Sequence, residues 1–328
     1  MKVLAGDIGG TNSRLALCEV AGARVHALAE QTFASSDYGS LSEVVRTFLA
    51  GAGAQVHSAC FGLPGPVRGR RAQLTNLPWL VDADTVEREL GLDDVWLLND
   101  LESYAYGLAT LEPTALRQIK PGIAMPRSNA ALIAAGTGLG EAGLAWDGRT
   151  SRPFASEGGH SDFAPSTPLE DELLVHLRAI HGHVSWERVV SGPGLVAIHT
   201  FLLVRSGAEA PAWMNVPPKE LSPLISDRGR DGSDPLCVQA LSMFLGLYGA
   251  EAGNLALKHL ALGGLYVGGG IAPKLVDMMG SSPFVERFVD KGRMQPLLTD
   301  VPVYVVLDDH TGIWGAASYA AARGQASK

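Results

Sequence analysis

The feature that most constrains the fold of this chain is the glycine-rich segment DIGGTN, residues 7–12. It joins two short apolar runs, Val3 to Ala5 and Leu15 to Cys18, and this arrangement is typical of a β-hairpin. Gly9 and Gly10 suit the turn because glycine adopts positive φ without strain. A tight hairpin that needs its glycines for the turn alone is one interpretation of the segment.

The same turn also suits a phosphate group. Its glycines allow close approach to the backbone, so that N–H groups can face an anion, and Thr11 and Asn12 add further donors. Asp7 stands two residues before Gly9 at the end of a strand, where it could hold Mg²⁺ through water. An acid placed before GGT on a strand is more specific than a glycine pair alone.

A second hairpin is predicted in the other half of the chain. The apolar runs Ala131 to Ala135 and Ala142 to Trp146 flank the turn GTGLGE, Gly136 to Glu141, which suggests a duplicated architecture. Gly136, Thr137 and Gly138 offer donors suited to the other side of a polyphosphate. The segment is not a P-loop, because no GK[ST] follows. A purely structural turn is the alternative.

A third glycine cluster consists of Gly268, Gly269 and Gly270. It follows an apolar strand, and there the backbone could pass close to a flat base or ribose. By itself, such a cluster serves packing more often than binding.

The segments between these turns alternate between strand and helix signals, which indicates the α/β class. In the first half we expect helices at Leu41–Leu49 and Thr85–Leu90 and strands at Val56–Phe61 and Val95–Leu98. In the second half we expect a helix at Pro168–Ile180, capped by Thr167 and with an apolar face of Leu169, Leu173, Leu174, Leu177 and Ile180. A flexible or dimer-contacting loop is expected at Ala208–Pro235. We then expect a helical region at Val238–Leu260, strands at Leu262–Val267 and Val301–Leu307, and a helix at Ile313–Ala322.

Asn99 and Asp100 lie where a buried strand ends and a helix begins, the place where open α/β sheets bind ligands. A helix N-terminus keeps a carboxylate ionised, as a general base requires. Asp100 is therefore the candidate catalytic residue for phosphoryl transfer to an alcohol, with Asn99 able to bind a neighbouring hydroxyl. A simple N-cap is the alternative role for the acid.

Two further segments offer polar groups to a sugar. EGGH places Glu157 and His160 on a loop loosened by glycine, where both could reach vicinal hydroxyls, although a surface ion pair explains them equally well. Glu187, in HVSWERVVSGPG, is a weaker candidate, because it could be a first-turn helix charge after Ser185.

Composition excludes several classes of protein. The 328 residues carry a net charge of −8 with no basic run, which argues against a nucleic-acid partner. Cys18, Cys60 and Cys237 never form CxxC, which argues against a disulfide framework or a cysteine zinc site. The N-terminus lacks the core of a signal peptide, and the apolar stretch Leu255–Ile271 is interrupted by Lys258 and His259, so we expect neither a signal peptide nor a membrane span. A soluble protein of the cytoplasm fits these features.

Seven motifs, taken in this order, closely resemble the bacterial glucokinases of the hexokinase and actin-like ATPase superfamily, over Lys2 to about Ala317. They are DIGGTN, TNLPW (Thr75–Trp79), LLND (Leu97–Asp100), GTGLG, EGGH, ERVVSGPG and VGGGIAPK. The branch resembles the proteobacterial type, because the cysteine-rich zinc motif of the ROK sugar kinases is missing after His160.

This resemblance implies an actin-like ATPase (ribonuclease H-like) α/β fold with two domains around a cleft. It implies a small domain of residues 1–110 plus 301–328, a large domain of residues 111–300, and a homodimer. Glucose would be held by Asn99, Asp100, Glu157, His160 and Glu187, with Asp100 as the base toward the 6-hydroxyl. The phosphates of MgATP would meet Gly6, Asp7, Ile8, Gly9, Gly10, Thr11 and Asn12 and the turn Gly136, Thr137 and Gly138, and adenosine would lie near Gly268, Gly269 and Gly270.

Three alternatives stay open at this point. The acceptor could be another hexose, such as fructose, mannose or an N-acetylhexosamine, because discrimination depends on pocket walls. The chain could be a sugar-sensing regulator without catalysis, although related repressors carry an additional N-terminal helix-turn-helix. The glycine hairpins alone would also fit an actin-like or Hsp70-like ATPase.

Overall fold

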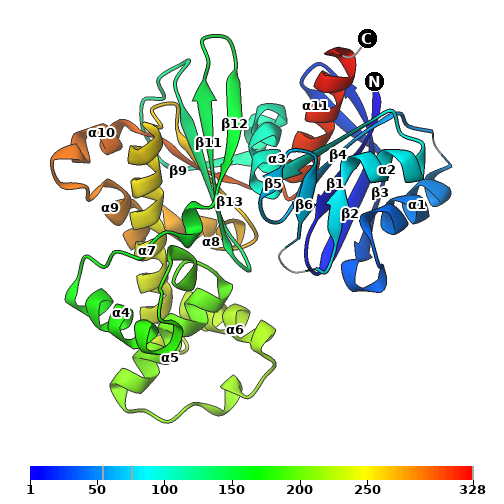
Figure 1. The fold of residues 1–328 in the computed structure, drawn as a ribbon. Helices are drawn as coiled ribbons and strands as arrows, with labels where there is room; N and C mark the ends of the chain where they lie inside the picture. Colours follow the sequence, from blue (N-terminus) through cyan, green and yellow to red (C-terminus); the bar gives the residue numbers. More distant parts are fainter. Residues whose placement is uncertain (54, 75–76, 327–328) are drawn as a thin grey trace. The chain divides into compact units, whose positions relative to one another are not determined.

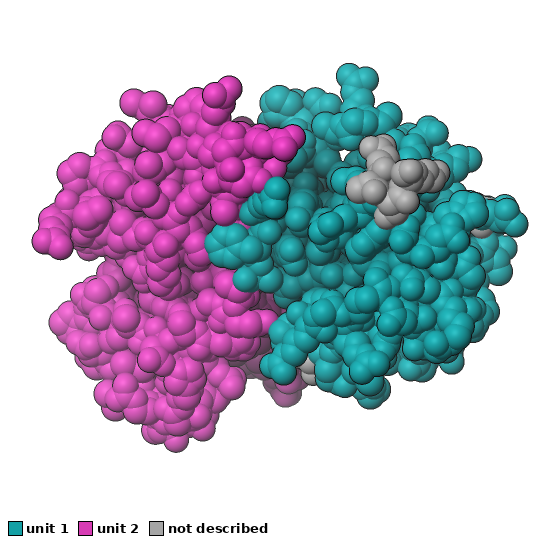
Figure 2. Space-filling model, turned by 45° about the horizontal axis from the view of Figure 1, so that its top comes forward, with its two compact units in different colours: residues 1–115, 152–155, 308–328 teal, residues 116–151, 156–307 magenta. Residues whose placement is uncertain are grey.

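The structure is a computed structural model that describes residues 1–53, 55–74 and 77–326. The chain forms two compact units, drawn in two colours in Figure 2. Unit 1 comprises residues 1–115, 152–155 and 308–328, and unit 2 comprises residues 116–151 and 156–307. Thr75 and Asn76 of the predicted TNLPW motif lie outside the described residues.

The main sheet of unit 1 has the strand order β3-β2-β1-β4-β8 within the described chain. Its strands are β1 (Lys2–Ile8), β2 (Asn12–Ala21), β3 (Arg24–Ala34), β4 (Ser58–Leu63) and β8 (Asp94–Asn99). β1 and β2 pair antiparallel, which confirms the first predicted hairpin, while β1, β4 and β8 run parallel. A small second sheet contains β5 (Val67–Arg68), β6 (Arg71–Gln73) and β7 (Leu80–Asp82).

Helices cover both faces of this main sheet, because its strands are apolar on both sides. Leu4 packs in one cluster with α1 and α2, whereas its neighbours Val3 and Ala5 pack in another with Ile313 of α11. Figure 1 shows α11 beside α3 and apart from α1 and α2. The helices of unit 1 are α1 (Leu41–Ala52), α2 (Ala83–Leu90), α3 (Asp100–Gly107) and α11 (Thr311–Ala326).

Unit 2 is built on a mixed sheet of strand order β12-β11-β10-β13-β14-β9 within the described residues. Its strands are β9 (Leu116–Lys120), β10 (Ala130–Ala135), β11 (Leu139–Trp146), β12 (Ser151–Ser156), β13 (Leu265–Gly268) and β14 (Val303–Val306). β10 and β11 pair antiparallel, which confirms the second predicted hairpin. β10, β13 and β14 run parallel, and β9 closes the edge antiparallel.

The long helix α7 organises the helical part of unit 2. It packs on β10 and β11, and α5, α6 and α9 pack against it (Figure 1). By length and composition α7 is the one helix in the described chain that could cross a membrane, but most of it is buried in the core. The helices are α4 (Pro168–His181), α5 (Gly192–Ser206), α6 (Pro218–Asp231), α7 (Pro235–His259), α8 (Ala272–Met279), α9 (Pro283–Val289) and α10 (Gln295–Asp300).

Two sequence expectations are wrong here. The segment Ala208–Pro235 is not a loop throughout, because it contains α6, whose Ile225 is fully buried. Pro218 starts that helix in its first turn, where the missing N–H costs nothing. The predicted apolar face of the Thr167-capped helix is also narrower than expected, since Ile180 is exposed while Leu173 and Leu177 are buried.

The strand predicted at Val301–Leu307 also requires a correction. It was assigned to the first domain, but β14 pairs with β13 and β9 in the sheet of unit 2. Only the helix that follows it, α11, belongs to unit 1. The other predicted domain boundaries stay predictions.

Candidate functional site

In unit 1 the candidate residues lie at one edge of the main sheet. β1, β4 and β8 are parallel neighbours, with Asp7 opposite Gly62 and Leu63 opposite Asn99. Neighbouring strands are about 4.8 Å apart, so two strand spacings, roughly 10 Å, separate Asp7 from the end of β8. The structure therefore brings the predicted metal ligand and the predicted base to the same sheet edge.

The turn after β1 is held in place by a serine that the sequence analysis did not identify. The Gly9 N–H donates to Asn12 O at 2.8 Å, which closes the turn. The Ser35 hydroxyl donates to Gly9 O at 2.8 Å, and the backbone N–H of Ser35 donates to Thr11 O at 2.9 Å. The turn is thus preorganised by contacts to its carbonyl groups.

Two residues of the predicted phosphate segment have a packing role. A Cβ on Gly6 would lie 2.6 Å from the Phe61 ring and 2.8 Å from a Leu15 methyl group, so glycine is required for strand packing. Ile8 is 1% exposed, so its side chain belongs to the core. At both positions only the backbone could face a nucleotide, and that role stays a prediction.

Asn99, not Asp100, is the N-cap of α3. Its Oδ1 accepts the N–H groups of Leu101 at 3.0 Å and Glu102 at 3.3 Å, and its Nδ2 donates to Gly65 O at 3.2 Å. Asp100 is the first helical residue and is half-buried, and its Oδ1 accepts the Leu101 N–H at 2.9 Å. The capping role considered for Asp100 therefore belongs to its neighbour, while the helix dipole favours the ionised form of Asp100.

Asp7 is a half-buried carboxyl. Burial raises its pKa, and the nearby Arg14 guanidinium partly offsets this effect. The start of α11 comes close, since a Cβ on Gly312 would lie 3.6 Å from the Asp7 carboxyl carbon. A desolvated carboxylate gains from a neighbouring cation, and oxygen ligands with bound water suit Mg²⁺, so Asp7 fits the predicted metal contact.

In unit 2 the two other glycine clusters follow adjacent parallel strands, because Ala134 at the end of β10 pairs with Gly268 at the end of β13. Gly269 has φ +81°, and a Cβ there would lie 2.5 Å from Ala135 O. Tyr248 of α7, another residue that the sequence analysis missed, accepts the Ala135 N–H at 3.1 Å and donates to Gly268 O at 3.5 Å. The buried Tyr248 hydroxyl thus forms hydrogen bonds with the backbone at the start of both glycine clusters.

The predicted sugar ligands of unit 2 surround the Gly136–Gly140 turn. Glu157 directly precedes the short 3₁₀ turn η4 (Gly158–His160), and His160 is its last residue. Both side chains are largely exposed, and Glu157 Oε2 lies 4.0 Å from His160 Nε2. Glu187 lies in the 3₁₀ turn η5 (Trp186–Arg188), and its Oε2 accepts the Leu139 N–H at 3.0 Å. η4 and η5 contact each other. The structure therefore brings Glu157, His160 and Glu187 together and shows that Glu187 also supports the glycine turn.

Glu141, directly after this turn, was assigned no role from the sequence, yet it is a buried acid, 1% exposed. The sequence does contain a signal for this burial, because Leu139, Glu141 and Gly143 share one side of an otherwise apolar strand. A carboxyl at an inward-facing strand position indicates a specific environment.

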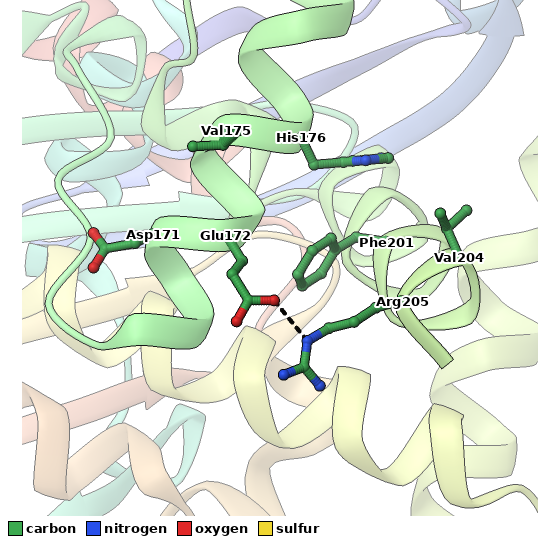
Figure 3. A pocket seen from close by; sticks show the side chains of 7 residues that line it. All are labelled: Asp171, Glu172, Val175, His176, Phe201, Val204 and Arg205. Atoms are coloured by element: carbon green, nitrogen blue, oxygen red, sulfur yellow. Dashed lines mark hydrogen bonds and ion pairs between the residues drawn. The ribbon is translucent and has the colours of Figure 1, made fainter. Parts of the chain in front are cut away.

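A cavity of about 470 Å³ lies elsewhere in unit 2, between α4 and α5. Figure 3 shows its lining, including the ion pair between Glu172 and Arg205 at 2.7 Å. None of the predicted site residues lines it. This pocket therefore carries none of the predicted chemistry.

Known proteins resemble the chain along almost its whole length. The family model "Glucokinase" matches residues 4–323. Relatives named glucokinase include those of Nostoc punctiforme, 40% identical over 97% of this chain and 98% of the relative, and Cronobacter sakazakii, 38% identical over 96% of each. The solved glucokinase from an Antarctic psychrotroph is 34% identical, with TM-score 0.85 over 98% of this chain and 99% of that one.

More distant structures share the fold. The glucokinase of Balamuthia mandrillaris, solved with glucose, is 18% identical with TM-score 0.80, covering 98% of this chain and 93% of that one. A ROK family glucokinase of Streptomyces griseus, solved with glucose and AMPPNP, is 21% identical with TM-score 0.67, covering 98% and 100%. The predicted family is confirmed by the full-length matches, which include proteobacterial relatives. The chain belongs to the glucokinase family.

Proposed function

We propose that this protein transfers the γ-phosphoryl group of ATP to O6 of D-glucose, giving glucose 6-phosphate and ADP at the entry to glycolysis. The observation that carries the proposal is the full-length match to the glucokinase family. The position of Asp100 at the N-terminus of α3, next to a sheet edge that also carries the glycine turn, supports it.

Asp100 is the proposed general base. The 6-hydroxyl oxygen attacks the γ-phosphorus, the bond to the β,γ-bridging oxygen of ADP breaks, and the hydroxyl proton passes to the Asp100 carboxylate. The first turn of α3 holds this carboxylate through the Leu101 N–H. Positioning supplies most of the rate in such reactions, so a carboxylate fixed at a helix start is well suited to orient the hydroxyl.

The remaining sugar hydroxyls are assigned to Asn99, Glu157, His160 and Glu187. Asn99 belongs to unit 1 and the other three to unit 2, so the proposal requires both units to contribute to one substrate site. We propose a cleft that closes on glucose, because exclusion of water prevents wasteful hydrolysis of ATP.

The nucleotide is assigned to the glycine turns. Gly9 and Gly10 would meet the phosphates from unit 1, Gly136–Gly138 would meet them from unit 2, and adenosine would lie near Gly268–Gly270. Asp7 would hold Mg²⁺ through water, and the bound ion would neutralise phosphate charge. A homodimer in the cytoplasm completes the proposal.

Replacement of the proposed base tests the assignment. Asp100→Asn and Asp100→Ala should lower kcat by orders of magnitude, because both remove the proton acceptor, while glucose binding measured by calorimetry should largely persist. Thermal unfolding would verify that the fold is intact. A turnover number close to that of the wild type in either variant would exclude Asp100 as the base.

A further inference from the structure

The buried acid Glu141 lies directly under the segment that carries Glu157 and His160. A Cβ on Gly158 would lie only 1.9 Å from Glu141 Oε2, so the backbone of this segment rests on the carboxyl group. The Ser156 hydroxyl donates to Glu141 O at 3.1 Å and accepts the Gly158 N–H at 3.2 Å. The position of Gly158 is therefore set by Glu141 from both its side chain and its backbone.

Glu141 faces a second buried acid. Glu251 of α7 is 0% exposed and interacts with the Glu141 carboxyl. Two side chains of α7 donate hydrogen bonds to the Glu251 carboxylate: Lys258 Nζ at 3.0 Å and Asn254 Nδ2 at 2.8 Å. Lys291 Nζ donates to Ala250 O at 2.9 Å, and its positive charge also interacts with Glu251.

Lys258 pairs with Glu251, so a proton on Glu141 relieves the repulsion between the two buried carboxyl groups. Burial and the charge of Glu251 raise the pKa of Glu141 to about 8, while Lys258 acts in the opposite direction. Glu141 Oε1 is buried without a hydrogen-bond partner among the described residues, a situation that costs a neutral acid far less than an anion.

We propose that protonated Glu141, buried beside Glu251, is a positioning residue that seats the segment 157–160 for sugar binding. The inference rests on the proposed function, because it takes Glu157 and His160 as sugar ligands. When Glu141 loses this proton, two buried carboxylates repel each other. The Glu141 carboxylate then displaces Gly158, with which it is in contact, and the flanking ligands lose their alignment.

The kinetic test compares wild type with Glu141→Gln, which keeps the shape of the side chain but cannot lose a proton. We expect the KM for glucose of the wild type to rise above pH 8, by up to tenfold per pH unit for one proton, with a smaller change in kcat. In Glu141→Gln this rise should be absent. Glu170→Gln, which alters another buried glutamate paired with Arg287 at 3.0 Å, is the matched control and should keep the wild-type profile.

Amide hydrogen exchange of residues 156–161 gives a readout independent of catalysis. After correction for intrinsic exchange, this segment should lose protection between pH 6.5 and 9 in the wild type and keep it in Glu141→Gln. If Glu141→Gln does not fold, Glu251→Gln replaces it: this variant removes the second carboxylate, so no repulsion should arise at high pH and the segment should keep its protection. An equal loss of protection in wild type and variant, or the same rise in KM in both, would overturn the inference. Absence of glucose phosphorylation at every pH would instead refute the proposed function, while exchange would still report on the pair.

Discussion

Glu187 is a proposed sugar ligand that also contacts the glycine turn Gly136–Gly140. Its removal should therefore weaken the binding of both glucose and ATP. Its Oε2 accepts the N–H of Leu139, a residue only 6% exposed, at 3.0 Å. A Cβ on Gly138 would lie 2.5 Å from the same oxygen, so the turn fits tightly around the carboxylate. Glu187→Ala leaves the Leu139 N–H without this acceptor.

A hydrogen bond to a charged group contributes about 1.5–3 kcal/mol, which corresponds to a loss of roughly 10- to 150-fold in kcat/KM if the turn must keep its shape to bind ATP. We therefore expect Glu187→Ala to raise the KM for ATP as well as that for glucose. Glu187→Gln, which keeps a neutral acceptor, should restore part of the ATP effect.

Steady-state kinetics with each substrate varied at saturation of the other would measure both constants. Glu172→Ala is the matched control, because it removes an exposed glutamate of α4 that pairs with Arg205 of α5 (Figure 3). Its kinetic constants should stay close to those of the wild type. A Glu187→Ala variant with an unchanged KM for ATP would refute the proposed coupling between this carboxylate and the turn.

Two further predictions concern stability. Gly315→Ala should destabilise unit 1 severely, because the new Cβ would lie 1.7 Å from Ser103 O where α11 meets α3. Gly51→Ala, in open space on α1, should instead stabilise the fold by up to about 1 kcal/mol through helix propensity and so raise the melting temperature slightly. A stable Gly315→Ala variant would contradict the close packing. Lys120 Nζ donates to the carbonyl oxygens of Thr299, Val301 and Pro121 at 2.7, 2.8 and 3.1 Å. Lys120→Met should therefore lower the free energy of unfolding by about 2–4 kcal/mol in denaturant titrations, with unchanged enzyme kinetics. An unchanged unfolding midpoint would refute this role.

Both hairpins and the helices α1, α2, α4, α7 and α11 could be predicted from the sequence, because their signals are local, whereas α5, α6, α8, α9 and α10 were missed. Glycines in the turns, apolar alternation in the strands and Thr167 as a cap all act within a few residues. The segment Ala208–Pro235 is rich in proline and charge, which favours a loop, and so the helix α6 was missed. Burial of Ile225 against the core stabilises this helix although Pro218 and Pro223 lie within it.

The supporting contacts of the candidate site could not be predicted, because they join residues distant in sequence. Ser35 reaches back to Gly9, and Tyr248 connects Ala135 to Gly268. The sheet in which β14 lies is equally non-local, which explains the wrong assignment of that strand to the first domain. The identities of Asn99 and Asp100 were visible in the sequence, but the division of roles between cap and helix start required coordinates.

The most direct test of the central claim is a measurement of ADP formation with and without glucose and Mg²⁺, with the phosphorylated product identified by ³¹P and ¹³C NMR. The account predicts one glucose 6-phosphate for each ADP, phosphorylation at O6 alone, and no turnover when either glucose or Mg²⁺ is omitted. ADP formation at the same rate without sugar, or a phosphorylated product other than glucose 6-phosphate, would contradict it.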